Sequence, residues 1–288
     1  MDTLFRCVKG GFHREELKLY LTAVSVYFWG LIFLAWLSFP ADHKFSIMTH
    51  TFSFLGSFEA KHNPQWWWIF SIAMVSWGIL MVPLVFYYHR RFVAISRGGA
   101  VTGTLLLLLG CAGISMVGIF PDASPVLFGS VRWTDIHEKA ALMVAAGFIF
   151  GLSCHGVLLL KDRFFMANNP HGLRFDHGKL FWPYLMWSSV LAVSAYFLIR
   201  WEFVYPQWKA AAMAEGRDIG SSWSASLGTR YSFPLWEQAM IYTLYIFLVW
   251  FALVLPANSV PTSSSPGSSP ARARTAAARG ASRREGKS

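Results

Sequence analysis

The chain has 288 residues, of which 55% are hydrophobic, 17% aromatic and 14% charged. Soluble domains usually carry about a quarter charged residues, so this composition excludes an ordinary soluble protein and indicates a membrane protein. The three cysteines, Cys7, Cys111 and Cys154, exclude a disulfide scaffold and lack the spacing of a zinc site. The net charge of +10 is consistent with the Lys and Arg residues that membrane proteins keep on their cytoplasmic side. We therefore expect no nucleic-acid partner.

Six stretches of the chain are long and apolar enough to cross a membrane. A spanning helix needs about 20 mostly apolar residues for a hydrocarbon core about 30 Å thick. The stretches are residues 20–39, 66–87, 100–120, 139–160, 180–199 and 234–255, most of them bounded by Pro or Gly. The predicted fold class is therefore all-α: a polytopic membrane protein with a six-helix transmembrane bundle within residues 20–256.

The basic residues predict the orientation of these helices. Most of the 25 Lys and Arg residues lie in residues 1–19, in the second and fourth connections, and in the C-terminal tail. Because Lys and Arg are retained on the cytoplasmic side, we expect residues 1–19 and the C-terminus to be cytoplasmic. No small-residue cleavage site precedes the first stretch, so it is expected to be a retained anchor in the plasma membrane, the inner membrane of a bacterium.

Two further segments have their own character. The outer loop at residues 200–233 contains Trp208 to Glu215, which is rich in helix-forming residues and predicts a short separate helix on the outer surface. Residues 257–288 are rich in Ser and Pro and then in Arg, with almost nothing to bury, so we predict a disordered basic cytoplasmic tail. Its basic end either lies against anionic lipid or is simply solvated.

Titratable residues gather on the predicted outer side, at the first outer loop and at the adjoining ends of the third, fourth and sixth apolar stretches. Ionisable groups at or within a membrane are costly and are by default a functional hypothesis. The predicted catalytic residues are His50, His137, Asp122 and Glu237, and the predicted substrate-binding residues are Ser46, Ser53, His62 and Asn63. The structural alternatives are a carboxylate favoured by a helix dipole at Glu237 and a helix cap near His137.

Metal and haem chemistry remain open in the sequence. His50, His137 and Asp122, together with His62, offer zinc-type ligands, but no His-Glu-x-x-His signature sets their geometry. The spacing of Ser46 and His50 resembles that of membrane ceramidase-like hydrolases, whose His-x-x-x-His pair is missing from the last apolar stretch. His137 and His155 share a helix face but lie about 27 Å apart, and each would need an axial partner from another helix to bind haem. The cofactor is therefore unknown.

Glycines in the third and fourth apolar stretches allow close backbone approach between spanning helices. Gly147 and Gly151 form a small-xxx-small pair, and the preceding stretch contains Gly103, Gly110, Gly113 and Gly118. We interpret these glycines as structural. No phosphate-binding loop and no serine nucleophile elbow is present, so the sequence does not support ATP-driven transport or serine hydrolase chemistry.

Short motifs resemble a known membrane family. They are Ser53-Phe54-Leu55-Gly56 with Asn63-Pro64-Gln65-Trp66-Trp67, Gly118-Ile119-Phe120-Pro121-Asp122, and His137 before Ala140-Ala141. This order resembles the prokaryotic six-helix family called domain of unknown function nine hundred and ninety-eight, and Trp236-Glu237 is similar to the DRAM, FRAG and Sfk proteins. The matching positions are Ser53, Gly56, Asn63, Pro64, Pro121, Asp122, His137 and Glu237. The resemblance implies six helices and a link to lipid remodelling, and the loop 200–233 and the tail depart from it.

These observations leave two functional hypotheses. In the first, the outward polar residues bind or remodel a lipid headgroup, with His50 and His137 as acid, base or ligand and with Asp122 and Glu237 orienting them. In the second, the protein is a non-catalytic assembly or accessory subunit that contacts a membrane protein partner through its glycine faces and aromatic belt. A small-solute transporter would require broken helices or repeated halves, and the sequence shows neither.

Overall fold

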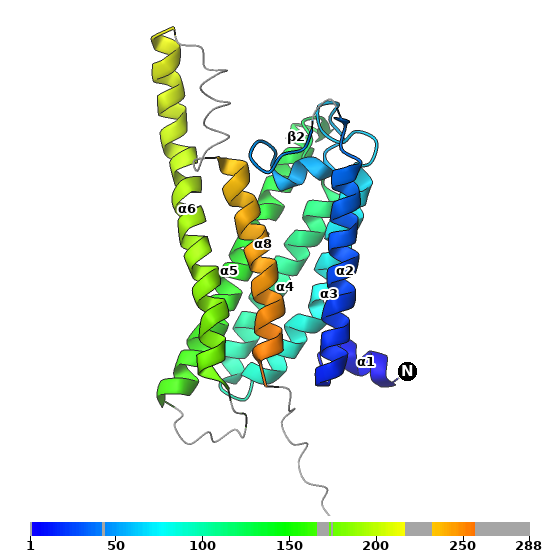
Figure 1. Ribbon diagram of the computed structural model, residues 1–288, viewed down its shortest axis with the longest axis vertical. Helices are drawn as coiled ribbons and strands as arrows, with labels where there is room; N and C mark the ends of the chain where they lie inside the picture. The colour runs from blue at the N-terminus through cyan, green and yellow to red at the C-terminus, as the bar shows by residue number, and fades with distance from the viewer. Residues whose placement is uncertain (1, 42–43, 166–172, 174, 217–231, 257–288) are drawn as a thin grey trace, which may run out of the picture.

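The computed structural model describes residues 2–41, 44–165, 173, 175–216 and 232–256. These residues form seven α-helices, a short 3-10 helix and a two-stranded antiparallel hairpin (Figure 1). In chain order the elements are α1 Asp2–Val8, α2 Arg14–Leu37, η2 Phe52–Gly56, α3 Trp67–Phe92, α4 Arg97–Ile119, β1 Val126–Phe128, β2 Val131–Arg132, α5 Trp133–Phe165, α6 His177–Ala214 and α8 Phe233–Val254.

Six helices, α2, α3, α4, α5, α6 and α8, are long and apolar enough to span a membrane, which confirms the predicted all-α, six-span fold class. Each overlaps one of the predicted apolar stretches. The helices alternate in direction, so α1 and the last turn of α8 lie at one end of the bundle, here called the terminal end (Figure 1). The opposite end carries residues 44–66, 120–137 and 232–238, here called the polar cap.

Helices α4 and α5 pack against each other with their backbones in close approach. A Cβ atom added at Gly147 would lie 2.3 Å from the backbone nitrogen of Gly110, and one added at Gly113 would lie 2.8 Å from the backbone nitrogen of Val144. Distances this short leave no room for any side chain, so glycine is required at both positions. These glycines therefore allow two helices of the same chain to pack closely, in agreement with their interpretation as structural residues.

Aromatic side chains join α2 to α8 in the middle of the bundle. The rings of Phe28 and Tyr245 stack with centroids 5.6 Å apart, and the Tyr245 hydroxyl hydrogen-bonds to the hydroxyl oxygen of Ser25 at 2.6 Å. Nearby, the Tyr88 hydroxyl donates to the carbonyl of Leu248 at 2.7 Å and so links α3 to α8. Buried hydroxyls in an apolar bundle need such partners, because an unpaired polar group there is costly.

Helix α6 is a single helix of 38 residues, about 57 Å long, which is nearly twice the thickness of a hydrocarbon core. The predicted separate helix from Trp208 to Glu215 is therefore wrong, because its residues form the last turns and C-cap of α6. The charged side chains of Arg200 and Glu202 end the apolar run without ending the helix. Hydropathy marks where the apolar surface stops, whereas the backbone continues through helix-forming residues.

Parts of two predictions fall outside the described residues. They are the remainder of the outer loop at 217–231 and the disordered basic tail at 257–288.

Candidate functional site

The polar cap is held together by hydrogen bonds between the loop at residues 44–66 and the start of α8. The predicted residue Glu237 takes part in one of them, and its neighbours in the first turns of α8 take part in the others. The Ser232 hydroxyl donates to the Met48 carbonyl at 2.7 Å, the Phe52 N–H donates to Glu237 Oε2 at 3.2 Å, and Gln238 Nε2 donates to the His50 carbonyl at 2.8 Å. The start of α8 is thus hydrogen-bonded to η2 and to the loop residues just before it.

The start of α8 is set locally. Ser232 is the N-cap residue, and its hydroxyl accepts the N–H of Leu235 at 3.4 Å. Pro234 follows in the first turn, where its fixed φ suits a helix and its missing N–H would have no partner in any case. This local signal fixes where the helix begins and therefore places Glu237 and Gln238 against the loop.

Asp122 joins three segments of the cap. It lies just after α4, and its Oδ2 atom accepts the hydroxyl of Ser53 from η2 at 2.9 Å. Its Oδ1 atom accepts the hydroxyl of Thr134 from the first turn of α5, also at 2.9 Å. Hydrogen bonds to a charged carboxylate are stronger than those between neutral groups, so Asp122 is a structural centre of the cap. The structure thus brings together Ser53 and Asp122, which the sequence analysis named separately as a substrate-binding and a catalytic residue.

His137 is buried, with 7% of its surface exposed, at the beginning of α5. Its Nδ1 atom lies 2.8 Å from the carbonyl oxygen of Phe120. A carbonyl oxygen can only accept, so Nδ1 carries the hydrogen and Nε2 of the neutral ring has a free electron pair. Within the described residues no hydrogen bond to Nε2 is found. His137 is therefore oriented as a base or as a ligand.

His50 has the opposite orientation. Its Nδ1 atom accepts the backbone N–H of Ser46 at 3.2 Å, which assigns the hydrogen of the neutral ring to Nε2. The ring is half-buried among aromatic side chains, with centroids 5.4 Å from Phe39, 5.5 Å from Phe45 and 5.9 Å from Phe54. Ser46 and His50 are thus in contact with each other, as part of the fold of the loop.

His62 and Asn63 are buried and engaged within the loop. His62 Nδ1 hydrogen-bonds to the Ser57 hydroxyl at 2.8 Å, and the ring stacks on Phe54 with centroids 3.8 Å apart. Burial lowers the pKa of His62 from 6.5 to about 4. Asn63 Nδ2 donates to the carbonyl of Leu55 at 3.1 Å. These contacts stabilise the loop, and the proposed role of both residues in substrate binding stays a prediction.

The candidate metal ligands do not form a preorganised site. Among the described residues, no group of three or more His, Cys, Asp or Glu side chains is placed to hold a metal ion. Both carboxylate oxygens of Asp122 already accept hydroxyl groups, and His50 accepts from the backbone of its own loop. The set His50, His137 and Asp122 is thus split between separate hydrogen-bonded contacts.

Sequence reasoning missed Ser124, Ser232 and Gln238 as residues that build the cap, and it noted Thr134 only as a possible helix cap and Glu59 only as a polar residue of the first loop. Thr134, Ser232 and Gln238 each hold a second segment in place, and Glu59 Oε1 accepts both the N–H and the hydroxyl of Ser124 at 2.7 and 2.5 Å. The hydrogen bond from the Ser124 hydroxyl lowers the pKa of Glu59. Only their position beside predicted residues, such as Gln238 next to Glu237, was a signal in the sequence.

His155, which the sequence offered as a haem ligand, is fully buried on α5. Its ring stacks on Phe92 with centroids 4.4 Å apart, and the ring of Tyr88 meets it edge-on at 6.1 Å. Neither ring nitrogen has a hydrogen-bond partner within the described part of the chain. The surroundings of His155 are thus those of a packed core side chain.

Comparison with protein-family models, curated proteins and solved structures finds no match to this chain. The resemblance to the six-helix family therefore rests on its short motifs alone and stays a prediction. The six long apolar helices identify the chain more broadly, as a multi-pass integral membrane protein.

Proposed function

We propose that this integral membrane protein binds the headgroup of a membrane lipid at its polar cap, with His137 as the residue that contacts it. The observation that carries the proposal is the fixed orientation of His137. The Phe120 carbonyl holds Nδ1 and leaves Nε2 with a free electron pair in a mostly buried position. An oriented imidazole of this kind either binds a polar ligand or accepts its proton.

The position of the cap supports a lipid as the ligand. Trp66 and Trp68, at the start of α3, are exposed beside the cap, and Trp67 lies between them. Tryptophans of this kind anchor membrane proteins at headgroup depth. Lipid headgroups are the polar molecules found at that depth of a membrane. They can therefore reach the cap directly from the bilayer.

The same geometry supports remodelling as a finer possibility within this proposal. His137 Nε2 can accept the proton of a hydroxyl nucleophile, which is the requirement for general-base catalysis of headgroup transfer or hydrolysis. Asp122 and Glu237 place two carboxyl groups in the same cap, which suits a hydroxyl-rich or cationic headgroup better than an anionic one. Under the predicted topology this cap faces the outer side of the plasma membrane.

The variant His137→Asn tests the proposal sharply. The amide nitrogen of asparagine can replace Nδ1 as the donor to the Phe120 carbonyl, while Nε2 is lost. Purified in mild detergent and examined by native mass spectrometry, the wild-type protein should carry lipid, and His137→Asn should lose most of it at an unchanged melting temperature. The matched control, Glu138→Gln, alters the neighbouring exposed side chain and should keep the lipid. A folded His137→Asn protein that retains its lipid contradicts the proposal.

A second candidate function is that of a non-catalytic subunit. The glycine faces of α4 and α5 pack against each other, so a partner would have to use another surface. Helix α6 offers one, because it is the least buried of the six long helices and exposes Phe203, Val204 and Met213 near its C-terminal end. If a protein partner copurifies, Phe203→Asp should release it without affecting bound lipid. Release by His137→Asn instead would contradict this assignment of the surface.

A further inference from the structure

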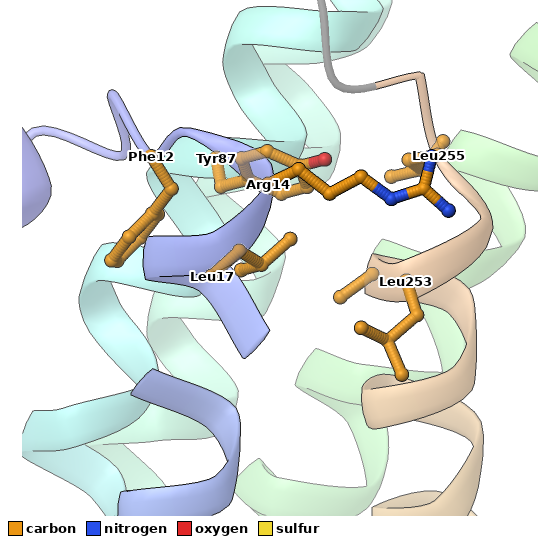
Figure 2. A pocket seen from close by; sticks show the side chains of 7 residues that line it. Phe12, Arg14, Leu17, Tyr87, Leu253 and Leu255 are labelled. Atoms are coloured by element: carbon orange, nitrogen blue, oxygen red, sulfur yellow. The ribbon is translucent and has the colours of Figure 1, made fainter. Parts of the chain in front are cut away.

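A small pocket opens at the terminal end of the bundle, between the start of α2, the end of α3 and the end of α8 (Figure 2). It lies at the opposite end from the polar cap and shares no residue with it. Its lining residues are Phe12, Arg14, Leu17, Tyr87, Ala252, Leu253 and Leu255. We call this feature the terminal notch.

The fold explains why the notch exists. Helices α2 and α8 contact each other at few positions, and the hydrogen bond between Tyr245 and Ser25 joins them farther up the bundle. The chain before α2 turns at Gly10, whose φ of 70° favours glycine and where a Cβ atom would meet the backbone nitrogen of Tyr87 at 2.2 Å. This close approach packs Phe12 against α3 and leaves an open wedge beside α8.

The notch is apolar inside and basic at its rim. Arg14 extends from α2 across the opening toward Leu255 (Figure 2). The guanidinium of Arg91 lies over the ring of Tyr87, 4.6 Å from its centroid, so a second cation adjoins the same wall. Phe12, Leu17 and the end of α8 provide the apolar surface. A cation beside an apolar wedge matches the boundary between a lipid phosphate and its acyl chains.

Arg14 differs from the nearby basic residues Arg6 and Lys18 in having no ionic partner. Arg6 pairs with Glu16 at 2.5 Å and Lys18 pairs with Glu15 at 2.7 Å. For Arg14, no ion pair and no side-chain hydrogen bond is found with any residue that the structure describes. Its charge is thus available to a ligand, whereas those of Arg6 and Lys18 are already matched.

We propose that the terminal notch is a binding site for an anionic phospholipid, whose phosphate pairs with Arg14 while its first acyl carbons pack on Leu17 and Leu253. The enclosed space is far below the usual range of a small-molecule pocket, so the lipid lies against the notch and is not enclosed by it.

This inference does not depend on the proposed function of the polar cap, because the two sites lie at opposite ends of the bundle. Phosphatidylglycerol and phosphatidylcholine are the probes, each titrated into the full chain in mild neutral detergent and followed by native mass spectrometry. We expect preferential retention of phosphatidylglycerol. Arg14→Gln should weaken that binding about fivefold, the effect of one basic residue at a lipid surface.

Lys18→Gln is the matched control, because it removes the same charge from the same helix about one turn away. It should change phosphatidylglycerol binding less than twofold, and Arg14→Lys should retain most of it. Leu253→Asp, which keeps Arg14 and adds a negative charge at an exposed lining position, should weaken binding as Arg14→Gln does. If Arg14→Gln and Lys18→Gln weakened phosphatidylglycerol binding equally, the attraction would be a nonspecific effect of positive charge. That result would overturn the proposal. Equal binding of phosphatidylcholine, or binding that needs removal of residues 257–288, would also overturn it.

Discussion

Glu237 accepts a hydrogen bond from the backbone N–H of Phe52 at 3.2 Å, across 185 positions of sequence. Phe52 is buried, so its N–H has little access to water if the carboxylate is removed. The neighbouring bond from Gln238 to the His50 carbonyl repeats the link one residue further along α8. Helix α8 therefore holds the loop at residues 44–66 in place, and the polar cap depends on segments far apart in the sequence.

Replacing Glu237 should loosen the loop. Glu237→Leu leaves the Phe52 N–H without its acceptor and should lower the free energy of unfolding by about 1 to 3 kcal/mol. Glu237→Gln keeps an oxygen acceptor and should cost less. Hydrogen exchange at the Phe52 amide, measured with thermal unfolding in detergent, checks the prediction. Unchanged protection of that amide in Glu237→Leu would show that the hydrogen bond does not hold the loop.

His62 should make the stability of the cap depend on pH. Burial lowers its pKa from 6.5 to about 4, so the folded protein keeps the ring neutral while the unfolded chain takes up a proton below pH 6.5. This contribution to stability is fully present above pH 6.5 and is lost as the pH falls toward 4, by at most about 3 kcal/mol.

The variant His62→Asn separates this effect from other titrating groups. It should be less stable than the wild type at pH 7.5, because the stacking on Phe54 is lost. Between pH 6.5 and 4 its melting temperature should fall less steeply than that of the wild type. Parallel curves for the two proteins would mean that His62 titrates normally when folded.

Gly147 should not tolerate even a methyl group. A Cβ atom there meets the backbone of Gly110 at 2.3 Å, so Gly147→Ala must push α4 and α5 apart and should cost about 1 to 3 kcal/mol. Gly30 on α2 has nothing within 4 Å of its Cβ position, so Gly30→Ala should be neutral or slightly stabilising. Thermal unfolding of both variants in the same detergent checks the pair, and equal melting temperatures would contradict the close packing.

His155 and His89 form a second matched pair. Both ring nitrogens of His155 are buried without a partner among the described residues, so His155→Leu removes an uncompensated polar group and should raise stability by about 1 to 2 kcal/mol. His89 Nδ1 hydrogen-bonds to the Thr104 hydroxyl at 2.9 Å, so His89→Leu should lower stability instead. Thermal unfolding of both variants checks the prediction, which is a higher melting temperature for His155→Leu and a lower one for His89→Leu. A loss of stability in His155→Leu would point to a bound water or ligand on that ring.

The number and approximate position of the spanning helices follow from the sequence, because the membrane requires a long apolar surface wherever a helix crosses it. The grouping of Ser53, Asp122, His137 and Glu237 at one end follows as well, since alternating helices carry every second connection to the same side. The structural role of the glycines in α4 and α5 was also visible, because only small residues allow close helix approach, whereas the pairing of these two helices with each other was not. Each of these properties follows from the composition of single helices or from the order of the helices along the chain.

The tertiary structure decided what those residues do to one another. Hydropathy could not reveal that α6 continues past Arg200, because the end of an apolar surface is not the end of a helix. Nor could it show that Asp122 accepts from Ser53 and Thr134, or that the Phe120 carbonyl fixes the tautomer of His137. Hydrogen bonds of this kind join residues far apart in sequence and are sensitive to shifts of a few tenths of an ångström, so they exist only once the helices are packed.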